Sequence, residues 1–109
     1  MANVETRMGI DDTLYFLWGD PKKSIVILSG KIFKVNVHRG NKVDYYYDQL
    51  KVEVAKIPVT KMEFGDFGMA HESALNPHPF RVEVGMINMY PTFTSKEMVK
   101  KYLRKLGAI

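Results

Sequence analysis

The C-terminal segment, residues 94–109, constrains the fold of this chain more than any other feature. Its apolar residues recur at helical spacing, which predicts one amphipathic helix over about residues 95–106. Thr94 and Glu97 have the spacing of a capping box, and Gly107 predicts the C-terminal end of the helix. The rest of the chain must therefore supply a surface for a single apolar stripe, whose members are Met98, Val99, Tyr102, Leu103 and Leu106.

The opposite arc of this helix is basic. Residues 96–105 include five basic and one acidic side chain, a formal charge of +4, which equals the net charge of the whole chain of 109 residues. Such a concentration of charge is typical of surfaces that bind phosphate, in nucleic acid or in lipid head groups. The competing interpretation is a solvated face, since the helix dipole also favours cations near a C-terminus. The candidate nucleic-acid-binding residues here, called the helix cations below, are Lys96, Lys100, Lys101, Arg104 and Lys105.

The first half of the chain has the patterns of β-strands. Residues 13–18 are rich in aromatic and aliphatic side chains, and residues 24–28 form an apolar run, so both segments predict buried strands. Residues 31–39 alternate between apolar and polar side chains, which predicts a strand with one face in the core. On this interpretation the side chains that face the core are Phe33, Val35 and Val37.

A turn at residues 39–42 returns the chain into a second, longer strand. The apolar positions of this strand are odd-numbered up to Tyr47 and even-numbered from Leu50 onward. Because a slip of one residue exchanges the two faces of a strand, we expect a bulge or sharp bend near Asp48 and Gln49. Long, bent strands are typical of small barrels.

The second half of the chain adds two predicted strands, at residues 60–64 and 80–84, separated by a long loop at residues 65–79. The predicted class is therefore α+β. We expect an N-terminal arm over residues 1–12 and a single β-rich domain over residues 13–109. Its architecture is predicted to be a small barrel, or a strongly bent antiparallel sheet, of about six strands with one C-terminal amphipathic helix.

Three consecutive tyrosines in the hairpin suggest a second binding surface. Because side chains alternate along a strand, at least one of these rings is expected to be exposed. An exposed ring beside basic side chains would suit base stacking and phosphate contact, as in proteins that bind single strands. The competing interpretation is that the rings fill the interior and a subunit interface. The candidate nucleic-acid-binding residues of the hairpin are Lys34, His38, Arg39, Tyr45, Tyr46 and Tyr47.

Other classes of site lack support in the sequence. The chain has no cysteine, which excludes disulfides, thiol nucleophiles and thiolate metal sites. His71 and His78 match no zinc-binding spacing, so we expect no metal, no cofactor and no catalytic residues. No apolar run is long enough to span a membrane and the N-terminus lacks the layout of a signal peptide, so we expect a cytoplasmic protein.

Two family resemblances bear on function. The order of GDPKKSIVILS, KIPVT and PFRVEV before a terminal helix resembles the toxin ribonucleases of the MazF/PemK type. That resemblance implies a small β-barrel that cuts RNA, with Thr60 at the position of the family's threonine. Lys23 stands near the place of its arginine, so the family's arginine is missing here, and no activity is carried over. The order of strands and helix also resembles pleckstrin-homology-like domains, which implies a lipid or peptide site.

The sequence as a whole predicts a small non-catalytic binding protein that contacts the phosphates of RNA or DNA through the helix and the hairpin. One alternative is a structural or assembly protein in a homo-oligomer or viral particle. Another is a MazF/PemK-like barrel ribonuclease, and the surface of a membrane is also left open as a partner.

Overall fold

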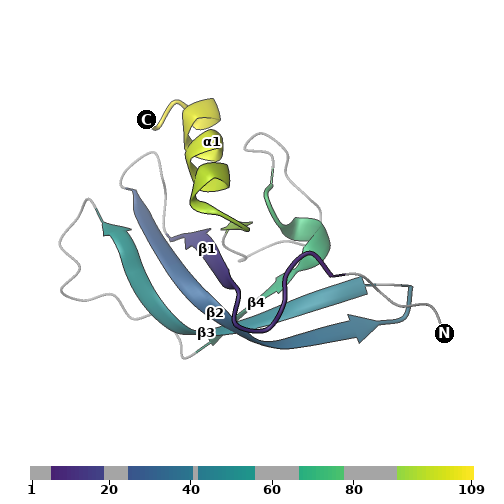
Figure 1. Ribbon diagram of the computed structural model, residues 1–109. Coiled ribbons are helices and arrows are strands. Elements are labelled where there is room, and N and C mark those ends of the chain that lie inside the picture. Colours follow the sequence, from purple (N-terminus) through teal and green to yellow (C-terminus); the bar gives the residue numbers. More distant parts are fainter. Residues whose placement is uncertain (1–5, 19–24, 41, 56–66, 78–90) are drawn as a thin grey trace.

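The computed structural model describes residues 6–18, 25–40, 42–55, 67–77 and 91–109. These residues form an α+β fold, as predicted, in which an antiparallel sheet is accompanied by one C-terminal helix (Figure 1). No helix in these ranges is long and apolar enough to cross a membrane. The elements in chain order are β1 (Thr13–Leu17), β2 (Val26–His38), β3 (Lys42–Ala55), β4 (Phe67–His71), a short 3-10 helix η1 (Glu72–Ala74), β5 (Thr92–Phe93) and α1 (Lys96–Leu106).

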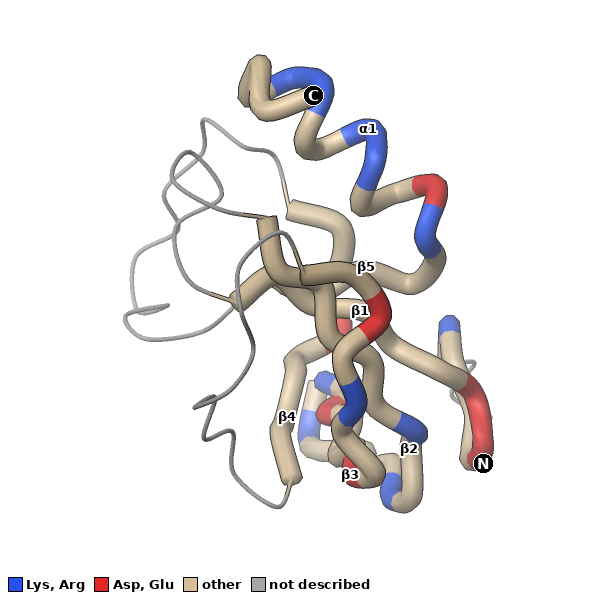
Figure 2. The backbone as a smooth tube through the Cα atoms, turned by 90° about the vertical axis from the view of Figure 1, so that its left-hand side faces the viewer, with Lys and Arg blue, Asp and Glu red and all other residues tan. Residues whose placement is uncertain are grey.

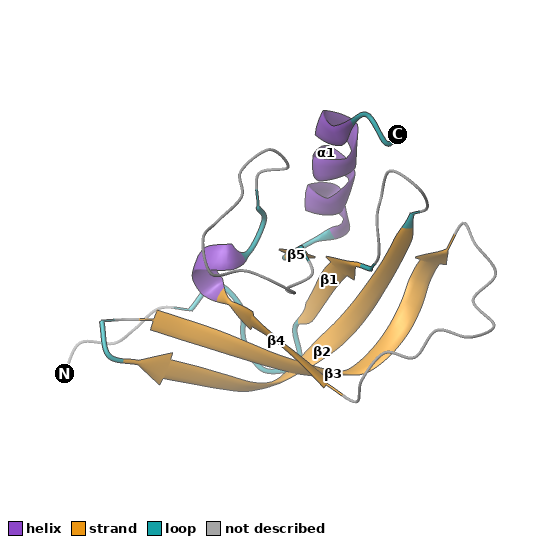
Figure 3. Ribbon diagram, turned by 180° about the vertical axis from the view of Figure 1, so that it is seen from behind, coloured by secondary structure: helices purple, strands orange, loops and turns teal. Residues whose placement is uncertain are grey.

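The sheet is open and strongly bent. Its five strands have the order β4-β3-β2-β1-β5, and each neighbouring pair is antiparallel. The long strands β2 and β3 curve together, as Figures 1 and 3 show. Among the described strands no ladder joins β4 to β5. The chain after η1 contacts β5 through a parallel bridge between Leu75 and Thr92 and a hydrogen bond of 2.9 Å from the Asn76 N–H to the Thr92 carbonyl. The bent sheet is therefore observed, whereas a closed barrel is not confirmed.

The predicted bulge in the returning strand is confirmed. The pairing of β3 with β2 steps from Asp48 opposite Lys31 to Lys51 opposite Ser29. Gln49, inside this step, has a φ of 52°, in the left-handed region. The one additional residue on β3 bends the strand and reverses its faces, as the change of apolar phase indicated.

The predicted core face of the first hairpin strand is wrong in part. Residues 24–28 and 31–39 were expected to form two strands, but β2 runs through both. The register shifts between Ile32 and Lys34, and this irregularity turns Phe33 to the outer surface, where it is 45% exposed. Val37 is also exposed, because the tip of the hairpin extends beyond the rest of the sheet (Figure 1). Ile32 is the buried side chain at this position.

The predicted loop at residues 65–79 contains regular structure, namely β4 and η1. Gly68 and Ala70 have low β-propensity, so β4 is specified by its pairing with β3 and not by its own composition. The strands predicted at residues 60–64 and 80–84 lie outside the described residues.

The main core lies inside the bend of the sheet. Tyr47 is central to it, because the backbones of Gly30 and Gly68 both lie directly against its ring. A Cβ atom added at Gly68 would lie 2.6 Å from the ring atoms Cε2 and Cζ of Tyr47. Only glycine leaves room for the ring at these two positions. The buried residues of this core are Leu14, Phe16, Val26, Leu28, Ile32, Val43, Tyr45, Tyr47, Ala70 and Leu75.

A second, smaller core lies beneath α1. Val99 and Leu103 are buried against residues of β1, β5 and the chain that leads into β2, namely Leu17, Phe93 and Ile25. The helix therefore covers one end of the sheet and leaves the distal part of the hairpin uncovered (Figure 1).

The two ends of α1 differ in how well the sequence predicted them. Gly107 ends the helix as predicted, with a φ of 74° and its N–H donating to the carbonyl of Arg104. The N-cap, however, is Ser95, whose hydroxyl accepts a hydrogen bond from the Met98 N–H at 3.3 Å. Thr94 was predicted for this role, but its backbone N–H and hydroxyl bond instead to the carboxamide of Asn76.

Candidate nucleic-acid interface

All five helix cations are exposed along α1 (Figure 2). Lys96 is engaged locally, since its Nζ lies 3.7 Å from the Glu53 carboxylate and 5.8 Å from the centre of the Tyr15 ring. None of the other four forms an ion pair with a residue that the structure describes. The unpaired positive charge of the helix therefore lies on Lys100, Lys101, Arg104 and Lys105.

Glu53 fixes the start of the helix to the sheet. Its Oε1 accepts a hydrogen bond of 2.8 Å from the Ser29 hydroxyl and lies 3.6 Å from the Nζ of Lys51. The Ser29 hydrogen bond, followed by the charges of Lys51 and Lys96, holds the pKa of Glu53 below its usual value. The carboxylate is thus ionised at neutral pH and offsets the charge of Lys96.

Two of the three hairpin tyrosines are buried, which corrects their assignment as base-stacking residues. Tyr45 is 0% and Tyr47 is 4% exposed, because both lie on the inner face of β3 before the bulge. The Tyr45 hydroxyl donates to the Glu72 carboxylate at 3.0 Å and accepts from the Met8 N–H at 3.1 Å. Burial raises the pKa of this hydroxyl. Tyr45 therefore joins the segment before β1 to the segment after β4.

Tyr46 lies on the outer face, within a cluster that we call the aromatic patch. The Nζ of Lys34 lies 5.4 Å from the centre of the Tyr46 ring. The ring of Phe33 is 6.4 Å from Tyr46 and 6.5 Å from Phe67, centre to centre. Phe67 is 61% exposed. The aromatic patch consists of Phe33, Tyr46, Phe67 and Met69.

The sequence did not predict three members of this patch. Phe33 was assigned to the core, because the bulge that exposes it has no local sequence signal. Phe67 and Met69 were assigned to a loop, and it is their pairing with β3 that brings them beside Tyr46. Their common signal was an alternation in FGMAH too short to predict a strand.

The side chain of His38 is 51% exposed but is hydrogen-bonded within the hairpin. Its Nε2 lies 2.6 Å from Asp44 Oδ2, and the Nδ1 of His71 bonds to the other oxygen of the same carboxylate. The Asp44 side chain is only 9% exposed. The structure thus gives His38 a role in the sheet, and sequence reasoning missed both partners because residue 71 lay in the predicted loop. In the described part of the chain no group of three or more His, Asp or Glu residues is arranged to hold a metal ion.

Lys51 of β3 meets the helix through Glu53, which it shares with Lys96, but the hairpin candidates Lys34 and Arg39 lie further along the hairpin. The helix packs against the start of β2, where Ile27 borders the smaller core. Lys34 and Arg39 follow further along the same strand and turn, a path of about 23 and 40 Å along the chain from Ile27 at about 3.3 Å per residue. Both are exposed. Figure 2 shows basic segments along α1 and mixed charges along the hairpin.

No protein-family model matches this chain, and neither does any curated protein or solved structure. Lys23 and Thr60, the two positions of the MazF/PemK resemblance, lie outside the described residues. Function is therefore argued from the described surfaces alone.

Proposed function

We propose that this protein is a small non-catalytic binding protein that contacts nucleic-acid phosphates through the helix cations. The observation that carries the proposal is that four of these cations are exposed on one face of α1 without an ion-pair partner among the described residues. Lys100 and Arg104 are one helical turn apart, and so are Lys101 and Lys105, which gives two parallel rows of charge. A phosphate backbone could displace counterions from both rows.

The hairpin does not support the proposal to the same extent. Lys34 is engaged with the Tyr46 ring, and His38 with Asp44. Tyr45 and Tyr47 are buried. Among the hairpin candidates, Arg39 is exposed without an ion pair to a described residue, and Tyr46 is partly exposed.

The salt dependence of binding tests this proposal. Four phosphate contacts predict that log K falls with log salt with a slope of about −3 for a single strand. The measurement is fluorescence anisotropy with a labelled RNA, and a DNA of the same sequence, of about 16 nucleotides, the upper site size of small single-strand binders. Changing Lys100, Lys101, Arg104 and Lys105 together to Gln should bring the slope close to zero and weaken binding about 100-fold at low salt.

The matched control removes the same charge outside the helix. Changing Arg7, Lys31, Lys42 and Lys51 together to Gln lowers the net charge equally, leaves α1 intact and includes none of the candidate binding residues. We expect only a small loss of affinity. Equal losses in the two variants would mean that net charge alone drives binding, and an unchanged affinity in the helix variant would mean that the helix cations are only solvated.

The aromatic patch supports a second candidate function, in assembly. Exposed contiguous apolar side chains are typical of protein contacts, and Phe67 and Phe33 are 61% and 45% exposed. On this proposal the chain forms a homo-oligomer or part of a larger particle through the patch. Sedimentation of the wild type and of a Phe33→Ser, Phe67→Ser variant is the test. A wild type that remains monomeric at high concentration would exclude self-assembly.

A further inference from the structure

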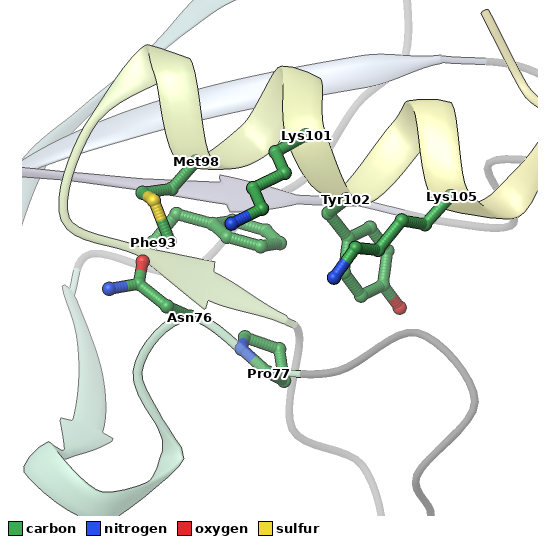
Figure 4. Close-up of a pocket in the computed structure, with 7 residues that line it drawn as sticks. All are labelled: Asn76, Pro77, Phe93, Met98, Lys101, Tyr102 and Lys105. Atoms are coloured by element: carbon green, nitrogen blue, oxygen red, sulfur yellow. The ribbon is translucent and has the colours of Figure 1, made fainter.

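A small pocket lies between α1, β5 and the chain that follows η1 (Figure 4). Its volume is about 140 Å³. This is below the few hundred Å³ of pockets that hold drug-sized molecules, so the pocket has room for about one ring system. The lining residues are Asn76, Pro77, Phe93, Met98, Lys101, Tyr102 and Lys105.

The inner part of the pocket is aromatic. Phe93 is 1% exposed and belongs to the smaller core, so its position is fixed. The Tyr102 ring meets it at 5.1 Å between centres and at an angle of 67°, edge to face. Met98 adds a polarisable thioether beside them. A flat apolar ligand would contact the partly exposed Tyr102 ring and Met98, with the buried Phe93 as the floor of the pocket.

The rim of the pocket is positively charged. Lys101 and Lys105 are exposed, one helical turn apart, and Figure 4 shows their side chains extending from α1 on the same side as Tyr102. None of the described residues that line the pocket carries a carboxylate. The Asn76 carboxamide is fixed by hydrogen bonds to Thr94, at 3.0 Å to the backbone N–H and 3.1 Å to the hydroxyl. The pocket thus combines a rigid aromatic interior with two cations at its mouth.

We propose that this pocket takes one unstacked nucleobase of a single-stranded nucleic acid, with the adjacent phosphates bound by Lys101 and Lys105. Aromatic side chains stack on a base only when it has left its neighbours, which is easy in a single strand and costly in a duplex. The inference rests on the proposed function and adds the class of ligand. It assigns the two rows of helix cations different roles, because Lys101 and Lys105 border the pocket whereas Lys100 and Arg104 do not.

Methyl NMR distinguishes the pocket from the rest of the surface. Met98 lines the pocket, and Met69 on the aromatic patch serves as an internal control. We expect a nucleoside monophosphate to shift the Met98 methyl resonance and leave Met69 unchanged, and inorganic phosphate alone to shift neither. A Met98 resonance that moves with neither the mononucleotide nor the labelled RNA would overturn the proposal.

Two double variants separate the pocket from the charge of the helix. Lys101→Gln with Lys105→Gln should weaken mononucleotide binding about tenfold, whereas Lys100→Gln with Arg104→Gln, which removes the same charge from the same helix, should leave it nearly unchanged. The first variant should also reduce the preference for single-stranded over double-stranded RNA of the same length. Equal effects of the two variants on mononucleotide binding would contradict the proposal that the nucleotide binds in the pocket.

The two proposals can fail separately. If RNA binding depends on salt and falls equally in both double variants while Met98 does not respond, the pocket is overturned and the proposed function stands. If the mononucleotide shifts Met98 but no RNA or DNA binds at low salt, the pocket is supported as a nucleotide site and the proposed function is overturned.

Discussion

The C-terminal helix and the β2–β3 hairpin carry similar basic side chains but use them differently. In the hairpin, Lys31 lies 3.8 Å from Asp11, Lys51 lies 3.6 Å from Glu53, and the Lys34 ammonium lies over a tyrosine ring, while Arg39 and Lys42 have no such partner among the described residues. On the helix only Lys96 has such a partner among the described residues. The difference shows that a count of charges does not locate a binding surface. What matters is which charges remain unpaired after folding.

Secondary structure explains much of this difference. In a sheet, neighbouring strands place side chains of distant sequence opposite one another, so charges of both signs meet. On an exposed helix face the neighbours of a side chain are three and four positions away in the same sequence. Here those neighbours are nearly all basic, with Glu97 as the exception. The sheet and the helix should therefore respond differently to substitution, and the following variants test that contrast.

The largest effect is expected in the sheet, at Gly30. Gly30→Ala should lower the free energy of unfolding by about 3 kcal/mol, because the new Cβ would overlap the Tyr47 ring and approach Leu50 Cδ2 to 2.9 Å. Urea denaturation measures the change. The control is Gly9→Ala, whose Cβ would meet no atom closer than 3.8 Å. Similar stabilities for the two variants would show that the ring does not lie against Gly30.

The second largest loss of stability is expected in the hydrogen-bonded cluster of His38, Asp44 and His71. Asp44→Asn replaces the carboxylate that accepts from both His38 and His71, and should cost about 2 kcal/mol of stability. Asp11→Asn is the control, because Asp11 is largely exposed and its ion pair with Lys31 should contribute less than about 0.5 kcal/mol. If Asp44→Asn lowers stability no more than Asp11→Asn does, the hydrogen bonds of Asp44 contribute no more to the fold than an exposed ion pair.

Substitutions in the helix should lower stability less than those in the sheet, and the largest loss within the helix is expected at its N-cap. Ser95→Ala removes the acceptor of the Met98 N–H and should cost about 1 kcal/mol, whereas Ser95→Gly should cost only a few tenths. Thermal unfolding followed by circular dichroism measures both. Equal stability of the wild type and Ser95→Ala would mean that Ser95 is not the N-cap and would favour the predicted Thr94 instead.

Glu53, which joins the two regions, should show a pH-dependent effect. The folded state holds its pKa below the usual 4.5, so its ionised form adds stability above that pH, and this stability is lost as pH falls through the folded-state value. Glu53→Gln should therefore be less stable than the wild type at pH 7, by less than about 1 kcal/mol because the side chain is partly exposed. The difference should vanish in acid. A difference that does not change with pH would rule out this linkage.

The smallest effect on stability is expected on the outer face of α1. Lys100→Gln with Arg104→Gln should change the free energy of unfolding by less than about 0.5 kcal/mol, because neither side chain has an ion pair among the described residues. Urea denaturation of this double variant, measured together with Asp44→Asn, compares the stability effects of helix and sheet charges directly. A loss above about 1 kcal/mol would show that these charges serve the fold.

The sequence predicted features that have local signals. The helix followed from its period, its end from Gly107, and the bend in β3 from a change of apolar phase near Gln49. The exposure of the helix cations followed from the same helical period. In each case the residues that determine the feature are neighbours in the chain.

Features that depend on distant pairing were missed. The strand β4 forms because residues 67–71 pair with β3, although Gly68 and Ala70 have little preference for strands. The pocket beneath α1 depends on Phe93, Tyr102 and Asn76, which come from β5, the helix and the chain after η1. No period or motif joins three such segments, so this part of the candidate site became visible only in the folded chain.

The contact of Tyr47 with two glycine backbones has a spectroscopic consequence. The space for a side chain at both Gly30 and Gly68 is taken by this ring, so one Hα proton of each glycine points at it. Both protons should carry large ring-current shifts and resonate outside the crowded glycine region of an NMR spectrum. Because the two glycines lie on β2 and β4, either side of the bent strand β3, these two signals would report directly on whether the sheet keeps its curvature when a ligand binds.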